Sequence, residues 1–328
     1  MSAIKTPKQI AGKFYNIERD GITQSLLSIF MSCRRAALWY LQGWVLKSPS
    51  FPLTFGSITH GILERVYTDI RLGKLRSSPS REQTLKYIDR VEKIWKEENP
   101  RADAKATELK ELSLLVAEAT MPLYFDYWSK DLKGIVWEKI EGNFKTPFAL
   151  PDGRKTFLRG AMDGVYRNPK RWLLETKTKS RIDERDLVDF LPFELQVNFY
   201  LMNLIMQGGD LPRGVLYNII RRTQLKQGKK ETIPQYGKRI AEDIKSRPED
   251  YFIRMEISIG RDEMEEFRKE VTGLLTDFYD WWEGKIPHYR NSGHCQTKYG
   301  RCEYLAAETG RMSIYTKRER VFRELEDN

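Results

Sequence analysis

"GAMDGVYRNPKRWLLETKTK", residues 160–179, contains two runs of strand-forming residues separated by an Asn-Pro pair. Such a pair marks a turn, so the stretch predicts a β-hairpin. Charged residues nevertheless stand inside both strands, with Asp163 in the first and Glu175 and Lys177 in the second. Residues two apart on a strand project to the same face, so the side chains of Glu175 and Lys177 point together. A strand facing a core would be apolar at these positions, so the hairpin is a candidate site.

The length of the loop decides whether the two carboxylates of the hairpin can meet. Direct opposition of Asp163 and Glu175 requires an odd number of loop residues, such as 168–170, or a bulge. An unbulged two-residue turn would offset them by one position and turn one carboxylate away. Opposed carboxylates repel unless a cation lies between them, and one hard divalent cation can bridge such a pair. The alternative is a solvent-facing Glu-Lys pair on an edge strand, and the spacing alone favours neither.

Helices and strands are predicted on both sides of the hairpin. Apolar periodicity predicts helices over residues 25–40, 55–70, 81–98, 104–128, 192–206 and 313–325, with Pro122 kinking or ending the fourth. Alternating patterns predict strands over residues 135–144, 155–167, 171–179, 214–221 and 251–259. A further helix follows the polar loop 222–232, and another ends at FYDWWEGKIP.

This order of helices, strand meander, helix and strands predicts an α/β (α+β) fold. We expect a central mixed β-sheet flanked by helices, with an N-terminal helical region. No stretch rich in Gly, Pro or Ser is long enough to link two domains, so we expect a single domain over residues 1–328. Its parts are an N-terminal helical part at 21–130, a sheet core at 131–260, and C-terminal helices with a Cys-bearing tail at 261–328.

The composition is that of a basic protein. The 328 residues include 56 Lys and Arg against 46 Asp and Glu, and the net charge of +10 favours a polyanionic partner such as nucleic acid. No apolar run approaches the ~20 residues of a membrane span, so no membrane partner is expected. With only three cysteines and no apolar signal segment at its start, the sequence predicts a reducing compartment, the cytoplasm. The sequence contains no phosphate-loop motif, so any ATP-driven motor would be a separate protein.

Two helices place polar side chains where they could support the hairpin. In the helix over 55–70, His60 lies off the apolar stripe, among charged residues. In the helix over 192–206, Gln196 and Tyr200 lie one turn apart on a common face. A lone histidine is more often a surface residue than a ligand, so these residues gain meaning only in combination.

In chain order, the informative motifs are SLLSIFMSCRRAALWY, FGSITHGILE with His60, GAMDGV with Asp163, LLETKTK with Glu175-Thr176-Lys177, and Gln196-x-x-x-Tyr200. Together they resemble the PD-(D/E)XK nuclease superfamily, in the RecB-type branch that includes CRISPR-associated adaptation exonucleases. The resemblance covers residues 23–304. Each motif is short, but agreement of all five in order and spacing is far more specific.

The resemblance implies a restriction-endonuclease-like core with a metal site. Asp163, Glu175, His60 and the backbone carbonyl of Thr176 would hold one or two Mg²⁺ or Mn²⁺ ions. Lys177 would orient the attacking water and help to deprotonate it, so that Asp163, Glu175 and Lys177 are the catalytic residues. Hydrolysis of a phosphodiester at neutral pH needs such a Lewis acid and a nearby cation.

The resemblance also implies DNA as the substrate. Gln196 and Tyr200 would pack behind the hairpin and contact the DNA backbone, and Arg34 and Arg35 of the opening helix would bind phosphates. The loop 222–232 is a second basic candidate. Phosphate contacts carry no sequence information, which suits an enzyme acting on DNA ends or single strands.

The predicted function is therefore a Mg/Mn-dependent DNA nuclease, an exonuclease in DNA recombination, repair or mobile-element metabolism. A separate helicase or recombination protein is a candidate partner. One alternative is a catalytically idle nuclease fold that serves as a DNA-binding or scaffolding subunit. Another is a protein-interaction domain in which the charged hairpin has no chemical role.

Iron–sulfur members of this branch hold a four-iron cluster with one cysteine of the opening helix and three near the C-terminus. Cys33, Cys295 and Cys302 match three of these positions, and Glu308 stands where the fourth is expected. Four thiolates ordinarily hold such a cluster, and a carboxylate suits it poorly, so we expect no cluster. Cys33 then packs as a small hydrophobic residue. A cluster completed by His294 is the alternative.

Overall fold

A computed structural model of the chain describes residues 5–47, 50–100, 102–130, 134–182, 184–208, 210–297, 300–322 and 325. Within these ranges six strands form the main sheet, in the order β1-β4-β5-β6-β7 with β3 paired to β4. They are β1 (Ile22–Thr23), β3 (Val136–Ala149), β4 (Lys155–Arg167), β5 (Arg171–Lys179), β6 (Gly214–Arg221) and β7 (Phe252–Ser258). The β1–β4 and β5–β6 pairs are parallel and the other pairs are antiparallel, which confirms the predicted mixed sheet.

The loop between β4 and β5 has the odd length that direct opposition of the two carboxylates needs. Arg167 pairs with Arg171, which leaves residues 168–170 as the loop, and the register continues to Gly164 opposite Leu174. One further step in this register sets the position of Asp163 opposite that of Glu175. The structure therefore excludes the two-residue turn, which would have offset the two carboxylates by one position.

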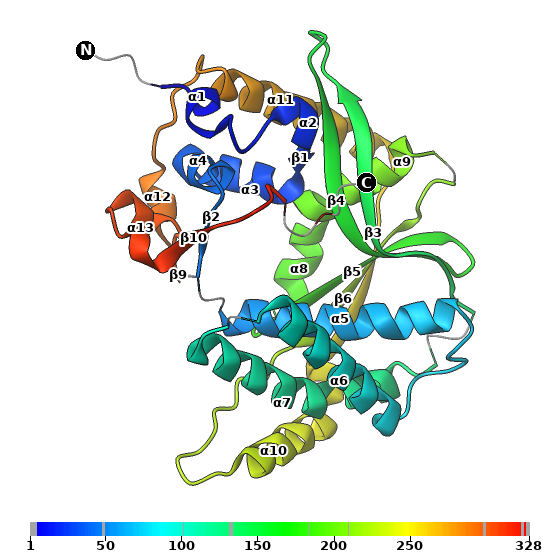
Figure 1. Cartoon of the computed structure of the whole chain (residues 1–328). Coiled ribbons are helices and arrows are strands. Elements are labelled where there is room, and N and C mark those ends of the chain that lie inside the picture. The colour runs from blue at the N-terminus through cyan, green and yellow to red at the C-terminus, as the bar shows by residue number, and fades with distance from the viewer. Residues whose placement is uncertain are drawn as a thin grey trace.

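Helices cover both faces of the sheet, and successive residues of β5 contact opposite layers. Leu173 packs in one hydrophobic cluster, whereas Trp172 and Leu174 pack in the other. The first cluster includes residues of α3 (Gln24–Ser32), α4 (Arg34–Leu41), α9 (Leu195–Met206) and α11 (Arg261–Trp282), and the second includes residues of α5 (Phe51–Arg71), α6 (Arg81–Glu98), α7 (Ala104–Tyr127) and α10 (Ile233–Ser246). In Figure 1 the second layer lies below, and β3 and β4 extend upward as a long hairpin beside α9 and α11.

The two ends of the chain are joined outside the main sheet. β2 (Trp44–Leu46) pairs antiparallel with β10 (Tyr315–Lys317), and the hydroxyl of Tyr304 donates to the carbonyl of Trp44 at 3.1 Å. Figure 1 shows the last segments of the chain lying beside α4. The remaining elements are α1 (Pro7–Ala11), α2 (Ile17–Asp20), α8 (Glu184–Phe190), α12 (Ser292–Cys295), α13 (Leu305–Glu308), β8 (Gln296–Thr297), β9 (Gly300–Arg301) and 3₁₀ turns at Leu191–Phe193, Pro248–Asp250 and Met312–Ile314.

Two predicted helices differ from the structure, and one alternative left open for a third is decided. The helix expected over 25–40 is interrupted at Cys33, whose extended backbone (φ −164°, ψ 115°) separates α3 from α4. In the described part of the segment 313–325, a 3₁₀ turn and β10 stand in place of the expected basic helix, because pairing with β2 outweighs the helical pattern; residues 323–324 lie outside the described residues. Pro122 does not end α7. The helix continues to Tyr127 because the residues around Pro122 are buried in the second hydrophobic cluster.

No helix that the structure describes combines the length and the apolar character needed to cross a membrane.

Candidate active site

Asp163 lies at a gap along one edge of β4. On that edge β1 pairs with Leu158 and Arg159, and β5 pairs with residues 164–167. The described strands leave residues 160–163 without a ladder partner between these two pairings. The side chain of Asp163 uses the gap, because its Oδ2 accepts the backbone N–H of Thr176 at 2.6 Å. The carboxylate thus satisfies a backbone donor that a ladder bond would otherwise satisfy.

Three potential metal ligands converge at this gap. Nδ1 of His60, on α5, lies 3.4 Å from Oδ1 of Asp163 and 3.6 Å from Oε1 of Glu141, on β3. One donor atom of each residue lies within 4.8 Å of the other two, which is close enough for the three residues to share an ion. Burial lowers the pKa of His60, but the charges of Asp163 and Glu141 outweigh it and raise the pKa well above its usual value. The three side chains of His60, Glu141 and Asp163 therefore favour a positive charge between them.

Glu141 was not among the predicted ligands, although the sequence contains a signal for it. The turn LPDGR sets the β3–β4 register, in which Gly142 pairs with Met162, so Glu141 falls opposite Asp163. The backbone of Glu141 has φ 43°, and it is the one non-glycine residue with positive φ in the described part of the chain. Such a conformation costs free energy and is retained where the surroundings require it. Burial also raises the pKa of the Glu141 carboxyl.

β5 contributes a buried ion pair beside this group. The side chain of Glu175 is 1% exposed, and its Oε1 lies 2.6 Å from Nζ of Lys177. Its Oε2 has no hydrogen-bond partner among the described residues. Burial and the charge of Asp163 raise the pKa of Glu175 to about 8, although Lys177 opposes the shift. Burial lowers the pKa of Lys177, but Glu175 outweighs it and holds the pKa above its usual value.

Gln196 and Tyr200 of α9 contact the ion pair from one side, and their predicted role in DNA binding stays a prediction. Nζ of Lys177 donates to Oε1 of Gln196 at 2.5 Å, and Nε2 of Gln196 donates to the hydroxyl of Tyr200 at 3.2 Å. Gly160 allows this approach, because a Cβ there would lie 2.9 Å from the Tyr200 ring. Gln196, Tyr200 and Asp163 line one cavity of about 190 Å³, called the metal pocket below.

The amino-acid sequence matches the PD-(D/E)XK nuclease superfamily over residues 22–307. The chain belongs to this superfamily. Its mixed sheet flanked by helices is the restriction-endonuclease-like fold, and as a nuclease it hydrolyses phosphodiester bonds of nucleic acid.

The solved structures that this chain matches are distant in sequence. One, described as a putative exonuclease from Eubacterium rectale, is 13% identical, with 82% of this chain and 83% of that chain covered and a TM-score of 0.44. Another, SSO0001, is 14% identical, with 70% and 76% covered and a TM-score of 0.26. A search of curated proteins found no match.

The two arginines predicted to bind DNA contact the C-terminal part of the nuclease. The guanidinium of Arg34 lies over the Tyr289 ring, 4.8 Å from its centroid. Arg35 donates to both carboxylate oxygens of Glu308, at 3.0 and 3.2 Å. Neither arginine lines the metal pocket, so their role in DNA binding stays a prediction. The same holds for the carbonyl of Thr176 as a ligand.

The three cysteines of the nuclease gather around one backbone segment near the chain ends. The N–H of Asn291 donates to Sγ of Cys33 at 3.4 Å, and Sγ of Cys295 donates to the carbonyl of Asn291 at 3.6 Å. The N–H of Cys302 donates to the carbonyl of Cys295 at 3.1 Å. Glu308, at the position of the expected fourth cysteine, is held by Arg35 and by the indole N–H of Trp39 at 2.5 Å. Whether iron binds there stays a prediction.

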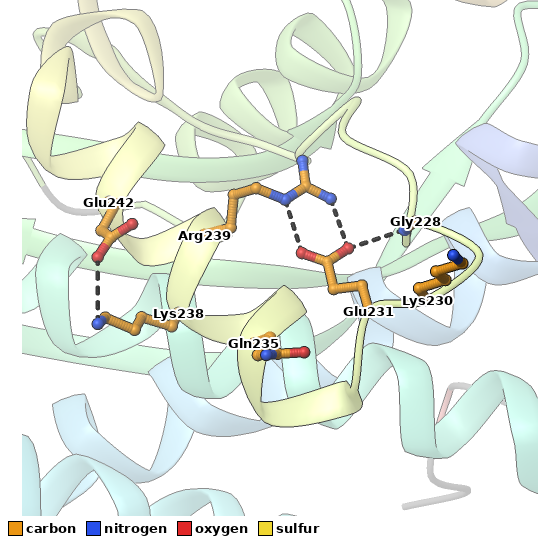
Figure 2. Close-up of a pocket in the computed structure, with 7 residues that line it drawn as sticks. All are labelled: Gly228, Lys230, Glu231, Gln235, Lys238, Arg239 and Glu242. Carbon is orange, nitrogen blue, oxygen red and sulfur yellow. Dashed lines mark hydrogen bonds and ion pairs between the residues drawn. The ribbon is translucent and has the colours of Figure 1, made fainter.

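A larger cavity, of about 610 Å³, lies at α10 and the basic loop before it (Figure 2). Its main charges are paired internally, since Arg239 lies 2.7 Å from Glu231 and Lys238 lies 3.7 Å from Glu242. Hydrogen bonds from Arg239 lower the pKa of Glu231 to about 2. None of the residues predicted for catalysis lines this cavity, so size alone does not identify the active site.

Proposed function

We propose that this nuclease is a Mg²⁺- or Mn²⁺-dependent deoxyribonuclease that removes nucleotides from DNA ends or single strands. The observation that carries the proposal is the convergence of His60, Glu141 and Asp163 beside the buried Glu175–Lys177 pair. The net charge of +10 supports a polyanionic substrate. A role in recombination, repair or mobile-element metabolism, with a separate helicase as partner, is part of the same proposal.

The residues present fit a hard divalent cation. Two carboxylates and an imidazole approach within 4.8 Å, and Oε2 of Glu175 is a buried acceptor without a partner among the described residues. Oxygen donors with one imidazole suit Mg²⁺ or Mn²⁺ better than a soft metal. Asp163, Glu141 and His60 would hold the ion, with Glu175 and the carbonyl of Thr176 as further candidates. A bound ion would supply Lewis acidity for the phosphate and would favour hydroxide as the nucleophile.

Lys177 supplies a fixed positive charge beside the candidate metal ligands. Because Glu175 keeps Lys177 protonated, its ammonium lowers the pKa of an adjacent water electrostatically and orients that water by hydrogen bonding. Gln196 restricts the position of the ammonium, and Tyr200 in turn holds Gln196. Preorganised charge of this kind stabilises a transition state without reorganisation during the reaction.

Cleavage of end-labelled DNA tests the proposal. We expect release of short products from linear single-stranded DNA in Mg²⁺ or Mn²⁺, no release in EDTA, and resistance of a covalently closed circle. Asp163→Asn removes one ligand charge and should abolish cleavage, whereas Glu82→Gln, on the exposed face of α6, should not. Cleavage of the circle would make the enzyme an endonuclease. DNA binding without cleavage in any metal would favour the idle-subunit alternative.

A further inference from the structure

A row of three polar side chains crosses three neighbouring strands of the main sheet. In the register of β5, β6 and β7, Thr176 pairs with Asn218, and Asn218 pairs with Arg254. Nδ2 of Asn218 donates to Oγ1 of Thr176 at 3.2 Å, and Nε of Arg254 donates to Oδ1 of Asn218 at 3.1 Å. Because an arginine side chain only donates, it fixes which end of the Asn218 amide faces Thr176. The three side chains, called the polar row below, thus form a directed chain of hydrogen bonds.

The polar row lies within an apolar layer. Thr176 and Asn218 are fully buried. Two residues away along each strand, the same face carries Leu174, Ile220 and Phe252, which all pack in the second hydrophobic cluster. Replacing both partners of a buried hydrogen bond by apolar groups of the same shape can be nearly neutral for stability. The stability of the sheet therefore does not by itself account for the polar row.

One end of the polar row reaches a candidate metal ligand. The backbone N–H of Thr176 donates to Oδ2 of Asp163 at 2.6 Å. The other oxygen of this carboxylate, Oδ1, lies 3.4 Å from Nδ1 of His60. The position of the Thr176 peptide therefore decides the direction in which Asp163 presents Oδ1 to the metal pocket.

The other end of the polar row reaches the helix that carries His60. Nη2 of Arg254 donates to the hydroxyl of Tyr124 at 2.9 Å, and that hydroxyl lies 3.2 Å from the hydroxyl of Tyr67. Tyr67 follows His60 on α5 by seven residues, which is close to two helical turns. The guanidinium of Arg254 also lies over the Trp128 ring, 4.3 Å from its centroid. The polar row thus connects the strand that contacts Asp163 with the helix that supplies His60.

We propose that Asn218 and Arg254 are positioning residues of the metal pocket. They act through Thr176 to hold Asp163 in the direction that a bound ion requires. Neither residue lines the metal pocket, so neither touches the ion or the substrate there. The inference rests on the proposed function, because it assumes that the ion binds Asp163. Partners that orient a metal ligand typically contribute roughly 10- to 100-fold in metal affinity.

Binding of Mn²⁺ alone, measured by titration calorimetry without DNA, tests this role. Asn218→Leu removes both hydrogen bonds of the amide and should raise the Kd of Mn²⁺ about tenfold, equivalent to about 1.4 kcal/mol. The matched control is Asn203→Leu, which removes another fully buried amide, one that donates within α9 to the carbonyl of Phe199. The control should bind Mn²⁺ like the unmodified protein. Arg254→Met frees the Asn218 amide to turn, should shift the Kd in the same direction, and carries the test if Asn218→Leu does not fold.

Hydrogen exchange in EDTA reports on the polar row without any metal. The backbone amide of Thr176, followed by mass spectrometry of peptides from β5, should exchange roughly fivefold faster in Asn218→Leu than in Asn203→Leu, because its hydrogen bond to Asp163 is weakened. Exchange as slow as in the control would overturn the inference, and so would faster exchange with an unchanged Kd for Mn²⁺. If the unmodified protein binds neither Mn²⁺ nor Mg²⁺ while the variant exchanges faster, the proposed function fails and the positioning of Asp163 by the polar row stands.

Discussion

The ion pair at Glu308 should stabilise the folded protein by a measurable amount. Its two oxygens accept hydrogen bonds from Arg35 at 3.0 and 3.2 Å and from Trp39 at 2.5 Å, and its side chain is 11% exposed. Glu308→Gln keeps the size of the side chain but removes the charge and directs an amide against the guanidinium. Hydrogen bonds to charged groups contribute ~1.5–3 kcal/mol, so we expect a loss of about 2 kcal/mol.

This loss converts into a shift of the melting temperature. An unfolding entropy of about 2.1 cal/mol/K per residue, applied to 328 residues, gives about 0.7 kcal/mol/K. The variant should therefore melt about 3 °C below the unmodified protein at pH 7. Thermal unfolding followed by circular dichroism in EDTA measures the difference. Glu82→Gln is the control, because Glu82 is 79% exposed in its pair with Lys86 and should give no resolvable shift.

The stabilisation should also depend on pH in a definite direction. Burial raises the pKa of Glu308, but hydrogen bonds from Arg35 and Trp39 outweigh it and leave the pKa below its usual value. The carboxylate therefore stabilises the fold at pH values above about 4.3, the pKa of an unfolded glutamate, and the effect is lost as the pH falls through the folded-state pKa. The two melting curves should converge in acid. A Glu308→Gln shift no larger than that of Glu82→Gln at pH 7, or one unchanged at pH 3, would refute the reasoning.

Three further results are expected. Lys177→Ala should leave DNA affinity within about twofold and lower cleavage by a factor of roughly 10² or more, because the ammonium acts mainly in the transition state; comparable turnover would remove Lys177 from the mechanism. His60→Ala and Glu141→Gln should each raise the Mn²⁺ concentration for half-maximal cleavage by about 10- to 100-fold, since each removes a ligand, and an unchanged titration for either would make that residue structural. Protein purified without oxygen should be colourless, and a brown preparation whose iron is lost on Cys302→Ser would contradict the expected absence of a cluster.

Two geometric features of the candidate site could be inferred from the spacing of residues along single strands and helices. Strand spacing left two possibilities, an odd loop such as 168–170 that lets Asp163 and Glu175 oppose each other and a two-residue turn that does not, and the structure has the odd loop. The one-turn spacing of Gln196 and Tyr200 likewise predicts the hydrogen-bonded pair. Both inferences depend only on local geometry, which the sequence specifies.

Other features could not be predicted because they depend on tertiary contacts. Glu141 acquires its place through pairing with β4, and its positive φ has no local signature such as glycine. β10 forms because a partner strand from the opposite end of the chain is available, although the segment has a helical pattern. The break at Cys33 similarly depends on the docking of the tail, whose Asn291 donates to the thiol.

The joining of the chain ends has a consequence for how this enzyme is made. Trp39 and Glu308 are separated by 269 residues, yet they hold the opening helices to the tail, and Leu325 lines the metal pocket. During translation the N-terminal layer leaves the ribosome long before these partners exist. A nascent or prematurely terminated chain therefore lacks one wall of the metal pocket. The metal pocket is therefore complete only after residue 325 has been synthesised.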